Sequence, residues 1–131
     1  MKILLTTTAI IESGAGLVLI TVPSLLTHIL FDVMLDTPVA LAVVRITGVA
    51  LLSLALACWL VRNEIQSRAA KGMISVMLLY NTAVATVLAY PAISAGLSGF
   101  GLWPAVLLHL ALAAWCTISL FKKPFANDQV S

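Results

Sequence analysis

The sequence predicts an all-α protein, a four-helix transmembrane bundle with a short amphipathic interfacial helix between the first two spans. Of its 131 residues, 62% are hydrophobic and only 9% are charged, which is outside the range of ordinary soluble domains. The apolar residues gather in four runs, and a helix of about 20 apolar residues crosses a hydrocarbon core about 30 Å thick. We therefore expect one integral membrane domain over residues 1–131, with spans at about 3–22, 38–61, 73–92 and 102–121.

The first predicted span, residues 3–22, has the position of a signal peptide but not its pattern. Glu12 interrupts the apolar run, and no small-x-small cleavage site precedes the next apolar run. Residues three and four positions from Glu12 share its helix face, and all of them are small: Thr8, Ala9, Ala15 and Gly16. Such a stripe lets a second membrane helix approach closely.

The segment after Pro23, SLLTHILFDVMLDT, predicts the short interfacial helix. Its leucines, isoleucine, valine and methionine recur at helical spacing, while His28, Asp32 and Asp36 fall elsewhere on the wheel, as in a helix lying on a membrane surface. His28 and Asp32 are four residues apart. We interpret them as a solvated surface pair and not as a metal or proton site.

The three later spans each carry polar side chains within an apolar run. The second, PVALAVVRITGVALLSLALACWLVR, contains Arg45, and a polar loop, RNEIQSRAAKG, follows it. The third, MISVMLLYNTAVATVLAYPA, has Tyr80 and Asn81 in its middle, and the fourth, after the glycine- and serine-rich ISAGLSGFG, contains His109. At about 1.5 Å of rise per residue, Glu12 and these groups fall within a band of about 8 Å.

Arg45 is expected to face the interior of the bundle and to pair with an anion there, because a guanidinium cannot lose its proton and is costly in lipid. We therefore predict an intramembrane ion pair in which Glu12 is the counter-ion of Arg45. Asn81 and His109 would complete the hydrogen bonding, with Tyr80 as a further member. Two interpretations stay open: the cluster locks helix register, or it forms a site that binds or transforms a molecule.

Several kinds of site are excluded by the motifs the sequence lacks. It has no HExxH, no Walker A loop, no GxSxG and no GxGxxG before a strand. We predict no metal site, and no cofactor is indicated. Cys58 and Cys116 lie in apolar runs without a CxxC, which predicts two buried free thiols. The few basic residues lie at span ends, so we expect no nucleic-acid partner.

The distribution of basic residues predicts the orientation. Apart from Arg45, they lie on one side of the predicted spans: Lys2, Arg62, Arg68, Lys71, Lys122 and Lys123. Asp32 and Asp36 are on the other side. The positive-inside rule then predicts a multi-pass protein of the bacterial inner membrane with both termini in the cytoplasm.

The segment RITGVALLSLALACWLVR, followed by LLYNTAVATVLAY and LWPAVLLHLALAA, resembles the small four-helix bacterial inner-membrane proteins of the broad DoxX-like kind. The shared feature is an arginine followed by a stripe of small residues and an apolar run, and it covers the first two spans. Most of those proteins are uncharacterised, so the resemblance implies a fold and a location and no activity.

Three hypotheses of function follow. The first is a site for a small, largely apolar molecule such as a quinone, with Arg45 and His109 as donors to an oxygen and Glu12 setting their charge. The second is a proton-coupled transporter in which Glu12 alternates between proton and substrate, in a homodimer. The third is an accessory subunit of a larger membrane complex with a purely structural polar cluster. In all three the lipid bilayer is a partner.

Overall fold

The computed structural model describes residues 1–64 and 67–121, and within them the structure is helical with no strand. The five helices are α1 (Lys2–Thr21), α2 (Pro23–Phe31), α3 (Pro38–Val61), α4 (Arg68–Ala95) and α5 (Leu102–Phe121). All except α2 are long and apolar enough to cross a membrane. The predicted fold class is therefore confirmed. The largest difference in bounds is at α4, which extends beyond the expected span of 73–92 at both ends.

Side chains that precede α3 and α4 explain where these helices begin. The hydroxyl of Thr37 accepts a hydrogen bond from the backbone N–H of Ala40 at 3.2 Å, and Ser67 caps Ala70 in the same way at 3.0 Å. Each cap satisfies one of the amide groups that a helix start leaves unpaired. The cap at Ser67 places the start of α4 a full turn before the apolar run.

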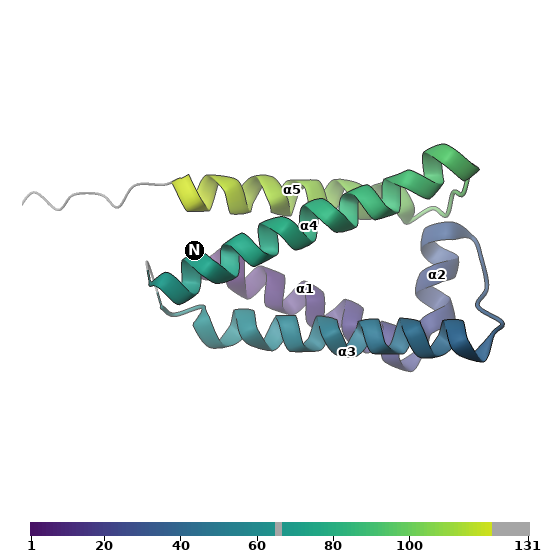
Figure 1. Cartoon of the computed structure of the whole chain (residues 1–131), viewed down its shortest axis with the longest axis horizontal. Coiled ribbons are helices and arrows are strands. Elements are labelled where there is room, and N and C mark those ends of the chain that lie inside the picture. The colour runs from purple at the N-terminus through teal and green to yellow at the C-terminus, as the bar shows by residue number, and fades with distance from the viewer. Residues whose placement is uncertain (65–66, 122–131) are drawn as a thin grey trace, which may run out of the picture.

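The long helices form two antiparallel pairs, α1 with α3 and α4 with α5, and packing within each pair is much more extensive than between them (Figure 1). Glycines explain the close approach in the first pair. A Cβ added to Gly16 would lie 2.8 Å from the carbonyl oxygen of Gly48, and the reverse distance is the same. Gly16, one member of the stripe of small residues on α1, thus packs against the backbone of α3.

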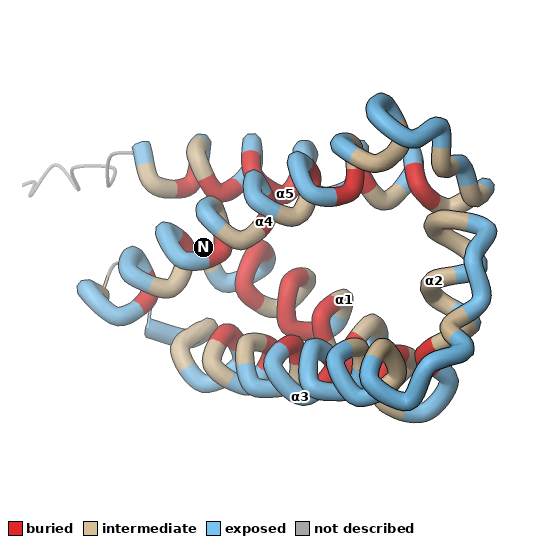
Figure 2. The backbone as a smooth tube through the Cα atoms, turned by 45° about the vertical axis from the view of Figure 1, so that its right-hand side comes forward, coloured by how far each residue is buried: buried red, intermediate tan, exposed pale blue. Residues whose placement is uncertain are grey.

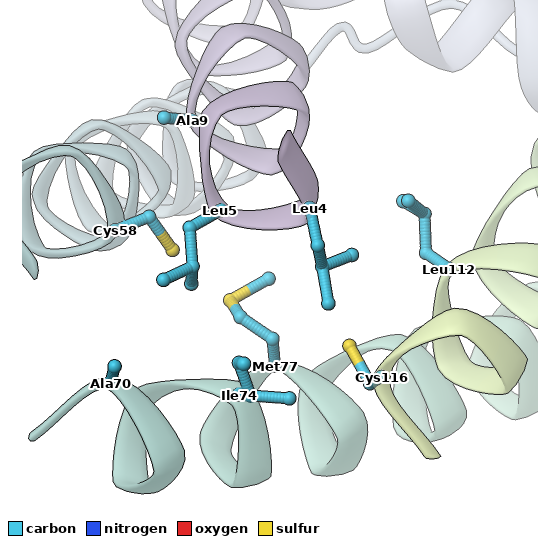
Figure 3. Close-up of a cluster of buried hydrophobic side chains, with 9 residues drawn as sticks. All are labelled: Leu4, Leu5, Ala9, Cys58, Ala70, Ile74, Met77, Leu112 and Cys116. Atoms are coloured by element: carbon cyan, nitrogen blue, oxygen red, sulfur yellow. The ribbon is translucent and has the colours of Figure 1, made fainter. Parts of the chain in front are cut away.

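An apolar cluster joins the two pairs at the end of the bundle where the N-terminus lies (Figures 1 and 3). It contains buried side chains from all four long helices: Leu4, Leu5, Ala9, Cys58, Ala70, Ile74, Met77, Leu112 and Cys116. Both cysteines are buried and free, as predicted.

Helix α2 crosses the opposite end of the bundle (Figures 1 and 2). The loop between α4 and α5 holds it there, because the N–H of Gly99 donates to the carbonyl of Leu30 and that of Gly101 to Ile29, each at 3.0 Å. These carbonyls belong to the last turn of α2, where no further helical amide can reach them. A Cβ on Gly99 would overlap the backbone of Ile29, so only glycine allows this approach.

The short helix is confirmed, but it ends earlier than the apolar pattern suggests. Asp32 has φ 56° and ψ 34°, a left-handed conformation that stops the helix after Phe31, so Val33 and Met34 lie outside it. The predicted pair is present: His28 Nδ1 lies 3.2 Å from Asp32 Oδ1, and their side chains are 52% and 70% exposed. A pair this exposed contributes little to stability.

Candidate functional site

A cavity of about 430 Å³ lies between the two helix pairs and is lined by residues of all five helices. Most of its wall is apolar, and α2 contributes one end of it through Leu26, Thr27, Leu30 and Phe31. Glu12, Tyr80 and His109 line the cavity as well. It is therefore an apolar chamber in which the polar groups of α1, α4 and α5 are close to one another.

Glu12 is the most constrained polar side chain in this wall. It is 1% exposed, and its Oε2 accepts a hydrogen bond from the hydroxyl of Tyr80 at 3.0 Å. Its other oxygen, Oε1, is buried and has no hydrogen-bond partner among the described residues, and neither has the Oγ1 of Thr8 one turn away. An unpaired polar atom in an apolar interior is costly.

Asn81 and His109 form the second polar contact of the site. His109 Nδ1 lies 2.8 Å from Asn81 Oδ1, and Asn81 Nδ2 donates to the carbonyl oxygen of Met77 at 2.7 Å. The Tyr80 and His109 rings meet edge to face, with centroids 5.9 Å apart. Contacts between Tyr80 and its two neighbours thus connect Glu12 on α1 with His109 on α5.

Two consecutive residues of α4, Tyr80 and Asn81, contact different neighbouring helices. Successive side chains are separated by about 100° around a helix, so Tyr80 and Asn81 face different directions. Tyr80 lines the cavity and reaches α1, whereas Asn81 is fully buried against α5. The structure therefore brings together four of the residues expected in the polar cluster: Glu12, Tyr80, Asn81 and His109.

Arg45 is the exception, and the expected ion pair with Glu12 is not formed. Arg45 is exposed, and within the described ranges the one salt bridge is that of His28 with Asp32. The reason is its angular position on the helix. The cavity-lining residues of α3 are Val44, Thr47 and Leu51. At about 100° per residue, Arg45 is turned from them by about 100°, 160° and 120°. Along α3, Arg45 is level with these lining residues, but it points outward.

Sequence reasoning missed the part that α2 plays in this site. Its apolar residues were expected to lie against the membrane surface, whereas Leu26, Leu30 and Phe31 line the cavity. The amphipathic pattern indicated that this helix has an apolar face. It did not indicate whether lipid or the end of the bundle covers that face.

Three side chains with hydrogen-bonding groups line the same cavity: a carboxyl group, a phenol and an imidazole. These groups can orient an oxygen-bearing molecule and exchange protons with it. Comparison with protein-family models, with curated proteins and with solved structures found no match to this chain.

Proposed function

We propose that this protein binds a small, largely apolar molecule with an oxygen-bearing end, such as a quinone, in the cavity between the helix pairs. The observation that carries the proposal is the convergence of the polar side chains of Glu12, Tyr80 and His109 in the wall of an otherwise apolar cavity of about 430 Å³. Ligand pockets are typically about 300–1,000 Å³, mostly apolar, with a few polar groups that fix orientation.

The roles of the residues follow from their positions. Glu12, Tyr80 and His109 line the cavity and would contact the polar end of the ligand, and the side chains from α2 would cover its apolar part. Asn81 is outside the lining and acts by positioning His109. Arg45 points outward and has no part in this site.

Filling the cavity tests the proposal. Ala105 lines the chamber on α5, and Ala111 is exposed on the same helix. We expect the Ala105→Phe variant to occupy the ligand space with a phenyl ring, whereas Ala111→Phe adds the same ring to the outer surface. Mass spectrometry of organic extracts from protein purified in mild detergent should find a small apolar molecule with the wild type and with Ala111→Phe. Equal amounts with Ala105→Phe would exclude the cavity as its site.

A proton-coupled transporter is a second candidate, favoured by one observation. Glu12 is a carboxyl group at mid-membrane with no cationic partner in the described ranges and with one unpaired oxygen, as a carrier of alternating proton and substrate requires. In this case, Glu12→Gln should abolish pH-dependent uptake into proteoliposomes while the fold is kept. Unchanged uptake would exclude this role.

We infer a location in a bacterial inner membrane with both termini in the cytoplasm. In support, Lys2, Arg62 and Arg68 lie at helix ends at the same end of the bundle, whereas Asp32 and Asp36 adjoin α2 at the other (Figure 1). Lys122 and Lys123, which the sequence assigns to the same side, lie outside the described residues. The homodimer and the larger membrane complex that the sequence left open stay predictions.

A further inference from the structure

The hydrogen bonds around Asn81 determine which nitrogen of His109 carries a proton. Asn81 Nδ2 lies 2.7 Å from the carbonyl oxygen of Met77, which can only accept a hydrogen bond. The amide is therefore oriented with its NH₂ toward Met77 and its Oδ1 toward His109. Because Oδ1 also only accepts, the 2.8 Å contact with His109 requires a proton on Nδ1 of the imidazole.

A neutral imidazole with its proton on Nδ1 has an unprotonated Nε2, which is a hydrogen-bond acceptor. The Nδ1 edge of the ring is directed at Asn81, which does not line the cavity, whereas His109 does. The opposite edge, which includes Nε2, therefore points away from Asn81 and is the edge that a ligand in the cavity can approach. The partner on Nδ1 is a neutral amide, and the described residues supply no hydrogen bond to Nε2.

From this geometry we infer that the cavity selects a lipophilic molecule whose polar end is a hydrogen-bond donor, a phenolic or alcoholic hydroxyl, in preference to a carbonyl or an ether. This inference rests on the proposed function and specifies its ligand: the reduced, hydroxyl form of a quinone would bind more tightly than the quinone itself. A hydroxyl donates to Nε2 of His109. A carbonyl or ether oxygen brings no proton and leaves Nε2 desolvated without a partner.

Nitrogen NMR of the protein in lipid nanodiscs, with isotope-labelled histidine, tests the first step. Introducing His28→Asn leaves one imidazole, and His28 is suitable for replacement because its side chain is half exposed and does not itself line the cavity. We expect a protonated Nδ1 and an unprotonated Nε2. The opposite tautomer, or an imidazolium with both nitrogens protonated, would overturn the inference.

Binding of two matched probes tests the second step. The probes are para-hexylphenol and para-hexylanisole, which differ only in that a methyl group replaces the hydroxyl proton, and each affinity is expressed as mole fraction in the bilayer. We expect the phenol to bind about five- to tenfold more tightly, which is the effect of one hydrogen bond, and to shift the Nε2 resonance. In Asn81→Leu the tautomer is no longer fixed, and the preference should fall.

The outcomes separate this inference from the proposal on which it rests. If both probes bind with equal affinity and Ala105→Phe blocks them, the cavity binds lipophilic molecules but does not select a donor, and the inference is wrong. If neither probe binds, the proposed function fails and the inference fails with it. If Asn81→Leu does not fold, the tautomer and the phenol preference of the wild type still decide the question.

Discussion

The hydroxyl of Tyr80 donates to Oε2 of Glu12 across 3.0 Å, and in the described part of the chain this is the one side-chain hydrogen bond that joins the two helix pairs. Apolar packing joins the pairs at one end of the bundle and α2 connects them at the other. The Glu12–Tyr80 contact lies between these regions, in the cavity wall. A change in the distance between the two helix pairs would therefore also change the positions of Glu12 and Tyr80 in the site.

Removing the Tyr80 hydroxyl should destabilise the bundle modestly. We expect Tyr80→Phe to lower the free energy of unfolding by about 0.5–1.5 kcal/mol, with values near the lower end typical of membrane proteins. Unfolding in mixed micelles with increasing SDS measures this change. In the background of Glu12→Leu the hydroxyl has lost its acceptor, so Tyr80→Phe should cost less there. Equal costs in both backgrounds would show that the two groups do not interact.

Glu12 and Arg45 should behave as independent sites. Because Arg45 is exposed and forms no salt bridge with Glu12, the effects of Glu12→Leu and Arg45→Leu should add within about 0.3–0.5 kcal/mol. In a buried ion pair, loss of one partner would cost about 3–5 kcal/mol, and loss of both would recover much of it. The same SDS titration on the single and double variants distinguishes these cases. If the double variant regains most of the stability that one single variant loses, the two side chains do form an ion pair.

Two glycines on α1 form a matched test of the α1–α3 contact. A Cβ on Gly16 would lie 2.8 Å from a backbone oxygen of α3, whereas a Cβ on Gly14 would meet nothing within 4 Å. Gly16→Ala should force the helices apart and cost about 1–3 kcal/mol. Gly14→Ala should instead stabilise the helix by about 0.5–1 kcal/mol. Thermal unfolding in detergent shows whether each variant is more or less stable than the wild type. A Gly16→Ala variant as stable as the wild type would contradict the close approach.

The position of α2 should depend on Gly99. Gly99→Ala places a methyl group against the backbone of Ile29, so α2 should detach from the α4–α5 loop and its amides should exchange faster with deuterium. The exposed neighbour Ser98 provides the control, because Ser98→Ala leaves both hydrogen bonds intact. Hydrogen exchange read by mass spectrometry should show a change in α2 for Gly99→Ala alone. Equal exchange in both variants would mean that the loop does not hold α2.

The proposed orientation predicts which introduced cysteines can be reached from outside the cell. An impermeant thiol reagent added to intact cells should label Asp32→Cys and Leu97→Cys, which adjoin the α2 end of the bundle, but not Asn63→Cys between α3 and α4. Cys58 and Cys116 are buried and should not react in the folded chain. Labelling at position 63 in sealed cells would reverse the orientation.

By itself, the sequence determined the features that depend on distance along the chain. Four apolar runs were long enough to span a bilayer, and the fixed rise per residue gave Glu12, Asn81 and His109 similar depths. The stripe of small residues on α1 predicted a close helix contact, and Gly16 makes it. These properties are local, because they follow from helix geometry and from the thickness of the membrane.

Only the tertiary structure decided which way each side chain faces. In a soluble helix the apolar side marks the core, but lipid is as apolar as the interior of a membrane protein, so hydropathy does not distinguish the buried face from the lipid face. Arg45 and Glu12 share a depth band, yet one points outward and the other into the bundle. The cavity, the direction of Tyr80 and the position of α2 across its end likewise depend on how the two helix pairs pack together.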